Sequence, residues 1–578
     1  MPLIRMRRNQ KENWRWIALC AATALLLGGC KSSYYRKNAD KAAYEIITSA
    51  EKDVFGKNRE FSIDTPYSDR TPDEILALDL VNERQVPGDR FLTIQDALNL
   101  AVQNSREYQS AKEQLYLTAL TLTGEQYEFG PRFLANFSGN VDRTADGETR
   151  GTASSRVGVT QFLKTGGSIS TTIANDFLRF YTGDPRKSVL SSISVNLVQP
   201  LLRGAGRSIA AESLKQAERN VIYEIRSFAQ YQREFAIRVV NTYFSLLQNK
   251  DRVRNEYRSY ESQLESATYT EARGQAGRVN QLQVDEAQDA VLNAKNAYIS
   301  SATSYLNALD SFKILLGLPL TTHLRLDDSD LQSLGEGALA PLNLDREQAF
   351  LIAIEKHLDT LNEIDIFEDS KRKVKVAANQ LKTDLNILAD ASIDSERPTD
   401  YTSFNFDDLR VGAGIQLNLP LDRLRQRNNY RSTLVNFERA IRTLSLRLDE
   451  KKNQIETGLR NVEVSRRAYE ILKSSVEINE RRVEGQKLSQ QAGRGTVLDL
   501  NNAQNALVRA QNSLTSAMVN NLQAKLDLLL NIGVLDTDIE AFWKNTEAIQ
   551  VALEASKPDA SLLPQTDEIK LPNDIFGD

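Results

Sequence analysis

Few residues of this chain could carry out acid–base, nucleophilic or metal chemistry. Its two histidines are His323, in a segment rich in turn residues, and His357, within a helical pattern, and its two cysteines are Cys20 and Cys30. A transition-metal site needs several such ligands close together, and a nucleophile needs a neighbouring base. Asp and Glu are spread over helical segments, as on solvated helix surfaces. We therefore expect no catalytic site, no metal and no cofactor, and interpret the chain as not an enzyme.

One glycine-rich stretch could be mistaken for a phosphate-binding loop. Gly204-Ala205-Gly206 precedes a helical segment, but no Lys-Ser/Thr pair follows it and no buried parallel strand precedes it. We interpret it as a turn between two elements. The 578 residues include 72 Lys and Arg against 77 Asp and Glu, for a net charge of −5. This weakly acidic balance favours no nucleic-acid partner.

The first thirty residues hold the one candidate for covalent modification. A basic region over residues 5–15 is followed by an apolar run over 17–27 and by Gly28-Gly29-Cys30. The apolar run is too short to span a bilayer, and the pattern is that of a secretory signal peptide. Its small-small-Cys end resembles the bacterial lipobox, which implies cleavage before Cys30 and a diacylglycerol and acyl lipid on that residue. Lys31, in place of the Asp typical of inner-membrane lipoproteins, implies the outer membrane. The alternative is an ordinary signal peptide with an incidental cysteine.

Two long helical segments, residues 207–273 and 423–490, organise the rest of the chain. In the first, Val239, Leu246 and Val253 lie at the seven-residue spacing of a coiled coil. At 1.5 Å per residue such a helix is roughly 100 Å long. No proline interrupts either segment, and proline breaks helix interiors. Each segment therefore predicts one continuous helix that needs long partners.

Glycine-rich turns end both long segments and lead into return helices. Gly277-Arg278-Val279 follows the first and Gly493-Arg494-Gly495-Thr496 follows the second. A shorter helix precedes each strand region, over about 92–129 and 345–382. In each half the short helix and the return helix together match the long one in length. We therefore expect the two to stack end to end beside it.

Alternating apolar and small polar residues predict strands over about 132–199 and 384–419. Phe133, Ala135 and Phe137 alternate with polar residues in the first region, for example. Such ten-residue segments are typical of lipid-facing strands. The second region has two candidates and the first has up to four. We interpret residues 156–177 as an extra hairpin extending outward, with two further spanning strands as the alternative.

The two halves are copies of one unit. Matching residues are displaced by 252 before the strands (Ala97 to Ala349), by 220 after them (Pro200 to Pro420) and by 216 at the turns (Gly277 to Gly493). The second copy therefore has a shorter strand region. The resulting divisions are a signal peptide (1–29), a polar, irregular N-terminal extension (30–91), repeat 1 (92–317), a linker (318–343), repeat 2 (344–533) and a tail (534–578).

This order resembles the outer-membrane efflux protein family, the TolC-like exit ducts, over roughly residues 92–533. The resemblance rests on the duplicated helix–strands–helix–helix order and the paired Gly-Arg turns. Further support comes from the Ala287-Gln288 and Ala503-Gln504 helix starts and from Gln199-Pro200-Leu201-Leu202-Arg203-Gly204. It implies a mainly α fold with β: antiparallel coiled-coil helices forming a periplasmic α-barrel, and antiparallel strands forming a transmembrane β-barrel. The family norm is a homotrimer with four strands per copy.

The resemblance also implies two functional sites. In the family, the turns at Gly277, Arg278 and Val279 and at Gly493, Arg494, Gly495 and Thr496 pack against a periplasmic adaptor and close the pore. Two inward carboxylates follow the second turn and align with Asp499 and Asn502. Since Asn502 departs from the family pattern, we expect a constriction that is less selective for cations. The alternative is that Asp499 is a solvated helix residue.

The implied function is a passive exit duct that works with an adaptor, or membrane fusion protein, and an inner-membrane pump. It would be anchored in the outer membrane of a Gram-negative-type bacterium and extend into the periplasm, serving efflux or type I secretion. One alternative is a structural coiled-coil lipoprotein that spans the periplasm, which would need no strands. Another is the adaptor itself, which has one hairpin between lipoyl-like halves and no duplicated set.

Overall fold

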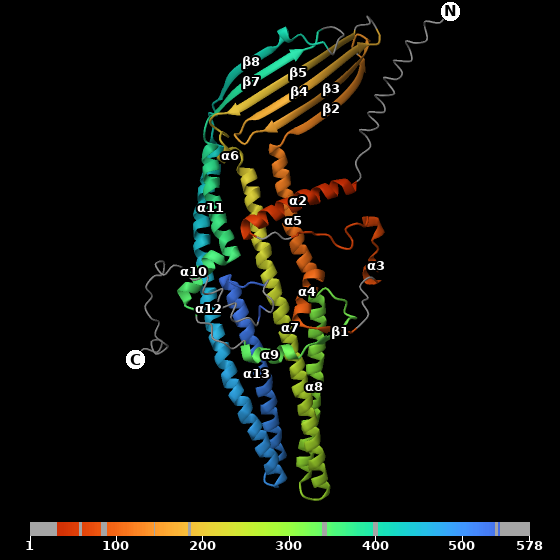
Figure 1. The fold of residues 1–578 in the computed structure, drawn as a ribbon, viewed down its shortest axis with the longest axis vertical. Helices are drawn as coiled ribbons and strands as arrows, with labels where there is room; N and C mark the ends of the chain where they lie inside the picture. The colour runs from red at the N-terminus through yellow and green to blue at the C-terminus, as the bar shows by residue number, and fades with distance from the viewer. Residues whose placement is uncertain are drawn as a thin grey trace, which may run out of the picture.

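The molecule is long, with a β-sheet at one end and two helical tips at the other (Figure 1). The computed structural model describes residues 32–56, 60–82, 89–143, 145–182, 187–337, 344–396, 403–537 and 542–543. In these residues, no helix has both the length and the apolar character needed to cross a bilayer. The predicted signal peptide, Cys30 and most of the C-terminal tail lie outside the described residues.

Repeat 1 is built along one very long helix. After the short α6 (Arg207–Ala210), α7 runs without interruption over Glu212–Gln275. The helix α5 (Arg106–Phe129) packs along the part of α7 nearer the sheet, and α8 (Gln281–Leu315) packs along the part nearer the tip (Figure 1). The two shorter helices therefore stack end to end beside the long one, as their lengths predict.

Repeat 2 has the same plan. Its long helix, α12 (Leu424–Gln491), packs against α11 (Leu358–Asn379) near the sheet and against α13 (Val497–Ile532) near the tip. The two repeats meet where α13 lies beside α7 and, nearer the sheet, where α11 lies beside α7. Towards the tips the four helices therefore follow the order α8, α7, α13, α12, with α8 and α12 at the open sides (Figure 1).

The short helix expected before each strand region is broken in both repeats. In repeat 1, α4 (Ile94–Asn104) ends at Ser105, where φ is −68° and ψ is 128°. In repeat 2, α10 (Arg346–Lys356) ends at His357, where φ is −75° and ψ is 116°. Extended backbone at these residues interrupts the helix, so the prediction of one continuous helix in each place is wrong.

A glycine in the other part of the repeat explains each break. Gly317 follows α8 with a φ of +70°, and a Cβ there would lie 2.1 Å from the carbonyl oxygen of Asn104. Gly533 follows α13 with a φ of +84°, and a Cβ there would lie 2.7 Å from backbone atoms of His357. The end of each return helix thus fits into the break, and only glycine allows both the close approach and the left-handed conformation.

The expectation of an irregular N-terminal extension is wrong for its first part. Ser32–Phe55 forms α2, which packs across α5 and α7 just below the sheet (Figure 1). Its Ala43 and Ile47 are fully buried in a cluster with Leu115 and Ala119 of α5. A narrow apolar stripe in a polar segment is enough for a helix that has a surface to pack on.

Small elements fill the level halfway along the bundle. β1 (Asp89–Leu92) pairs in parallel with β6 (His323–Leu326), and α9 (Ser329–Gly337) follows, so the linker is partly regular. These elements cover the largest apolar cluster, which includes Tyr243 and Phe244 of α7. Within the N-terminal extension, Pro72–Glu74 forms a 3-10 turn and Ala77–Asn82 forms α3.

Six strands form one antiparallel sheet in the order β2-β3-β4-β5-β7-β8. They are β2 (Arg132–Arg143), β3 (Thr149–Phe162), β4 (Ser168–Phe180), β5 (Lys187–Pro200), β7 (Asp384–Asp394) and β8 (Arg410–Asn418). Because β3 and β4 pair with their neighbours along nearly their whole length, the interpretation of residues 156–177 as an outward hairpin is wrong. The structure contains four strands of repeat 1 in one sheet, and the alternative that two further strands span the membrane stays a prediction.

Candidate functional site

The sheet has one apolar and one polar face. The strand register keeps each face on the same side across all six strands. Directly paired residues lie on the same face of a sheet. One face carries large apolar residues on every strand: Phe133, Phe137, Val157, Val159, Ile169, Ile173, Ile193, Val195, Ile387, Ile393, Val411 and Ile415. The other carries mainly Ser, Thr, Asn, Gly and Asp, for example Ser138, Ser154, Ser170, Asn196, Asp390 and Gly412. Among the described residues no helix packs on the apolar face, and such a face with a polar opposite face is the arrangement of a wall between lipid and water.

The predicted turns form the two tips at the end farthest from the sheet (Figure 1). At the first tip, Arg278 N–H donates to Arg273 O at 2.8 Å and Gly277 N–H donates to Gly274 O at 2.9 Å, with Gly277 at a φ of +70°. Asn280 then caps α8 by accepting from Gln283 N–H. Val279 lies next to this cap and is half-buried.

The second tip repeats this geometry. Arg494 N–H donates to Ser489 O at 2.9 Å and Gly493 N–H to Gln490 O at 3.0 Å, with Gly493 at a φ of +75°. Thr496 caps α13 by accepting from Asp499 N–H. The same paired hydrogen bonds that close a helix around a left-handed glycine therefore build both tips, and leave Arg278 and Arg494 exposed.

The two aperture candidates lie one turn above the second tip. Asp499 is exposed, and its carboxylate accepts a hydrogen bond from Thr496 Oγ1 at 2.6 Å, which completes the cap of α13. Asn502 is also exposed, one turn further along the same helix. The carboxylate thus has a structural role at the helix start in a single copy, and its role in a ring of three copies stays a prediction.

Hydrogen bonds between polar side chains join the two tips into one unit. Gln263 of α7 donates to Asn501 of α13 at 2.9 Å, and Gln504 of α13 donates to Ser262 at 2.7 Å. Closer to the tips, Arg273 Nη1 donates to the carbonyl oxygen of Gln490 at 3.1 Å. Near the tips the contact between repeats therefore combines these hydrogen bonds with a small apolar cluster of Ala267, Ala287 and Val497, whereas higher along α13 it is mainly apolar.

The helices at the open sides each carry an apolar stripe that is exposed in the described part of the single chain. On α8, Leu292, Ile299 and Leu306 are exposed at seven-residue spacing, although Ser301, about 200° around the helix from Ile299, is buried. On α12, Val464, Ile471 and Ile478 form the same pattern. Sequence reasoning missed these stripes, although their heptad spacing is the signal that could have found them.

The residues with catalytic potential stay apart. His323 lies exposed in β6, while His357 is buried at the start of α11, where its Nδ1 accepts from Thr360 N–H at 3.3 Å. Its Nε2 lies 3.2 Å from Nζ of Lys451, and burial first, then the charges of Lys451 and Arg233, lower the pKa of His357 to about 3. Among the described residues, no three metal-ligating side chains gather in one place.

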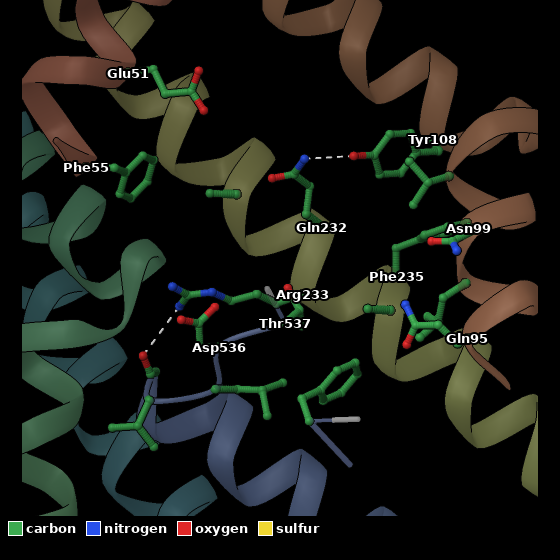
Figure 2. A pocket seen from close by; sticks show the side chains of 18 residues that line it. Glu51, Phe55, Gln95, Asn99, Tyr108, Gln232, Arg233, Phe235, Asp536 and Thr537 are labelled. Atoms are coloured by element: carbon green, nitrogen blue, oxygen red, sulfur yellow. Dashed lines mark hydrogen bonds between the residues drawn. The ribbon is translucent and has the colours of Figure 1, made fainter. Parts of the chain in front are cut away.

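A cavity of about 550 Å³ lies between α2, α4, α7 and the segment after α13. Figure 2 shows the side chains that line it. Gln232 donates to Tyr108 Oη at 2.7 Å across one side, and Arg233 Nη1 lies 3.4 Å from the carbonyl oxygen of Gly533. Three charged residues from three segments line it, Glu51, Arg233 and Asp536. The cavity marks the junction of the N-terminal helix, the long helix and the segment that follows α13.

Comparison with known proteins agrees with this architecture. Residues 149–318 match the family model of the outer membrane efflux proteins. The CmeC outer membrane channel of Campylobacter jejuni shares the fold with a TM-score of 0.56 at 14% identity, over 81% of this chain and 90% of that one. The outer membrane protein VceC of Vibrio cholerae gives 0.54 at 13% identity, over 76% and 96%.

The MtrE outer membrane channel of Neisseria gonorrhoeae, in its open state, gives a TM-score of 0.54 at 14% identity, over 76% of this chain and 88% of that one. No protein with a curated description matches the chain. The expected fold class, TolC-like with long antiparallel helices and antiparallel strands, is confirmed.

Proposed function

We propose that this chain, which has the fold of the TolC-like outer membrane channels, forms the outer-membrane exit duct of a tripartite efflux or type I secretion system. Three copies would surround one continuous passage, with the sheets in the outer membrane and the helices in the periplasm. The duct would conduct substrate passively, and the inner-membrane pump would supply the energy for transport.

The proposal rests on one observation. The single chain has two open sides in its helical part and two open edges in its sheet. The helix order leaves α8 and α12 outermost, each with an exposed apolar heptad stripe. The strand order leaves β2 and β8 outermost, each with one unpaired edge. Exposed apolar stripes and open sheet edges both favour association. Copies placed side by side in a closed ring would cover both apolar stripes and pair both sheet edges.

The proposed partners follow from the two ends of the molecule. The tips would dock a periplasmic adaptor, which connects the duct to an inner-membrane pump, and Arg278 and Arg494 are exposed there for such a contact. At the other end, Cys30 would carry the lipid anchor, two residues before α2 begins. A structural coiled-coil lipoprotein would have no use for a sheet whose apolar face is uncovered, and an adaptor would lack the duplicated repeat.

Variants on the open sides test the proposal. We expect the detergent-extracted wild type to be a trimer by light scattering and a tapered tube with a visible lumen by electron microscopy. Ile471→Glu on the α12 stripe should abolish the trimer but keep the helix content, because a buried unpaired charge is strongly unfavourable. Lys473→Glu, about 200° around the same helix, is the matched control and should stay trimeric.

Two outcomes would overturn the proposal. A monomeric wild type would contradict the proposed duct, and a solid rod without a lumen would favour the structural lipoprotein. In cells, the wild type and Lys473→Glu should restore export to a strain that lacks this chain, whereas Ile471→Glu should not.

A further inference from the structure

We propose that all six strands of each copy stand in the membrane wall, so that three copies close an 18-stranded barrel. This rests on the proposed function and departs from the four strands per copy implied by the family resemblance. The consequence is a wide mouth at the cell surface, which passes hydrophilic solutes too large for a twelve-stranded barrel. The strands in question are β3 and β4, which exceed the family number.

The first support is that β3 and β4 continue both faces of the sheet, with one hydrogen-bonded polar row, Ser155, Asn175 and Ser191, on the apolar face. On the apolar face, Phe133 of β2 pairs with Val159 of β3, which pairs with Thr171 of β4. One step along the same face, Val157 pairs with Ile173, which pairs with Ile193 of β5. A hairpin that stood in water outside the membrane would need no apolar side, and certainly not the side its neighbours use.

The second support is the exposure of the two outer strands. On the inner strands, apolar-face residues are moderately exposed: 47% for Val157, 45% for Ile173 and 36% for Val195. On the edge strand β2, Phe133 and Phe137 are exposed by 78% and 71%, and on the edge strand β8, Ile415 is exposed by 76%. The additional exposed area of these side chains on β2 and β8 is the area that one further neighbouring strand would cover.

The direction of the strands also allows closure. Each neighbour in the sheet is antiparallel to the next, and the number of strands is even. β2 and β8 therefore run in opposite directions, and β8 of one copy can pair antiparallel with β2 of the next. A second copy of this chain is the occupant of each open edge, and no lipid-exposed edge remains.

The third support comes from the internal repeat. Matching residues of the two repeats are displaced by 252 before the strands and by 220 after them. The difference of 32 residues equals the length of the hairpin Thr149–Phe180, which comprises β3, its turn and β4. The two repeats thus differ by one whole hairpin, and removing that hairpin from repeat 1 leaves the family number of strands.

The width of the mouth follows from strand geometry. With strands about 4.8 Å apart and tilted by about 40°, 18 strands give a backbone diameter of about 36 Å, against about 24 Å for twelve. Side chains that fill about 5 Å on each wall leave about 26 Å and about 14 Å of open width. The small residues on the polar face, among them Ser154, Ser170 and Ser194, leave this space open to water.

Thiol labelling from the cell surface measures this width without depending on the tips. Ser194→Cys places a thiol on the polar face in the middle of β5, and Val195→Cys places its matched control on the apolar face. Membrane-impermeant maleimides of increasing diameter are added to intact cells. We expect Ser194→Cys to react with reagents up to about 20 Å across and Val195→Cys to react with none. In a variant lacking residues 149–180, Ser194→Cys should react only with reagents narrower than about 14 Å.

Cryo-electron microscopy of the wild-type assembly gives a second measurement that needs no variant. An 18-stranded ring supports the inference. A twelve-stranded ring with β3 and β4 outside the wall overturns the inference, as does an unchanged size limit in the deletion variant. Each of these outcomes leaves a trimeric duct intact, whereas a monomer would overturn the proposed function itself.

Discussion

Replacing Asp369 by Asn should loosen the contact between the two repeats just below the sheet. Asp369 of α11 is 2% exposed and forms ion pairs with Arg219 of α7 at 2.6 Å and with Arg372 of its own helix at 2.5 Å. It also accepts from Tyr223 Oη at 2.7 Å and from Gln216 Nε2 at 2.9 Å. Asn preserves the shape but removes the charge that compensates two guanidinium groups.

The size of the effect follows from what the two arginines retain. Removing one member of a buried ion pair costs about 3–5 kcal/mol when the other is left uncompensated. Here Arg219 keeps Asp365 at 3.0 Å and Arg372 keeps Glu212 at 3.1 Å, and their side chains are 23% and 18% exposed. We therefore expect a smaller loss, about 2–3 kcal/mol, which is a factor of about 30–150 in the local opening equilibrium.

Hydrogen exchange of the detergent-solubilised protein measures this opening. Amides of α11 should exchange about 30–150-fold faster in Asp369→Asn, while those of α13 near the tip should not change. Glu368→Gln is the matched control, because its exposed pair with Lys371 contributes at most about 1 kcal/mol. Exchange in α11 of Asp369→Asn within threefold of the wild type would refute the view that this network holds the repeats together.

Three further predictions concern single residues. Because the pKa of His357 is lowered from 6.5 to about 3, the unfolded chain binds a proton that the folded one does not between these values. Stability should therefore fall by up to about 1.4 kcal/mol per pH unit below pH 6.5, and urea midpoints of His357→Gln should show a shallower fall. Gly533→Ala should lower thermal stability, since its Cβ meets the backbone of His357 at 2.7 Å, whereas Gly485→Ala, with open space in α12, should leave stability equal or slightly higher. Cys30→Ser should abolish incorporation of a labelled fatty acid but leave the protein in the outer-membrane fraction; wild type without label would favour an ordinary signal peptide.

The long elements were predictable from sequence because their signals are long and locally consistent. A proline-free heptad pattern over 60 residues fits little except a long helix. An alternating pattern between prolines fits little except strands. The breaks at Ser105 and His357 were not predictable, because the segments that pack into them, at Gly317 and Gly533, lie about 200 and 180 residues away in the chain. Helix α2 was missed for a similar reason, since its burial depends on the surface that α5 provides.

In the candidate site, too, local residues determine some features and distant segments determine others. The tip turns were found because a Gly-Arg pair after a long helix carries its geometry in its own residues. The role of β3 and β4 was misjudged because their alternation indicates strands but not the neighbours they pair with. Register is decided between segments, here by the pairing of Val157 with Ile173 and of Ile173 with Ile193.

Parity explains why the sheet can vary in width while the helices stay the same. Repeat 1 contributes four strands and repeat 2 contributes two, both even numbers, so the chain enters and leaves the sheet at the same side in each repeat. α5 and α7, like α11 and α12, therefore lie below the sheet and can form the same bundle (Figure 1). One added strand would send the next long helix to the wrong side of the membrane, whereas one added hairpin changes only the circumference. A hairpin is thus the smallest unit by which such a fold can widen its mouth, and Thr149–Phe180 is one such unit.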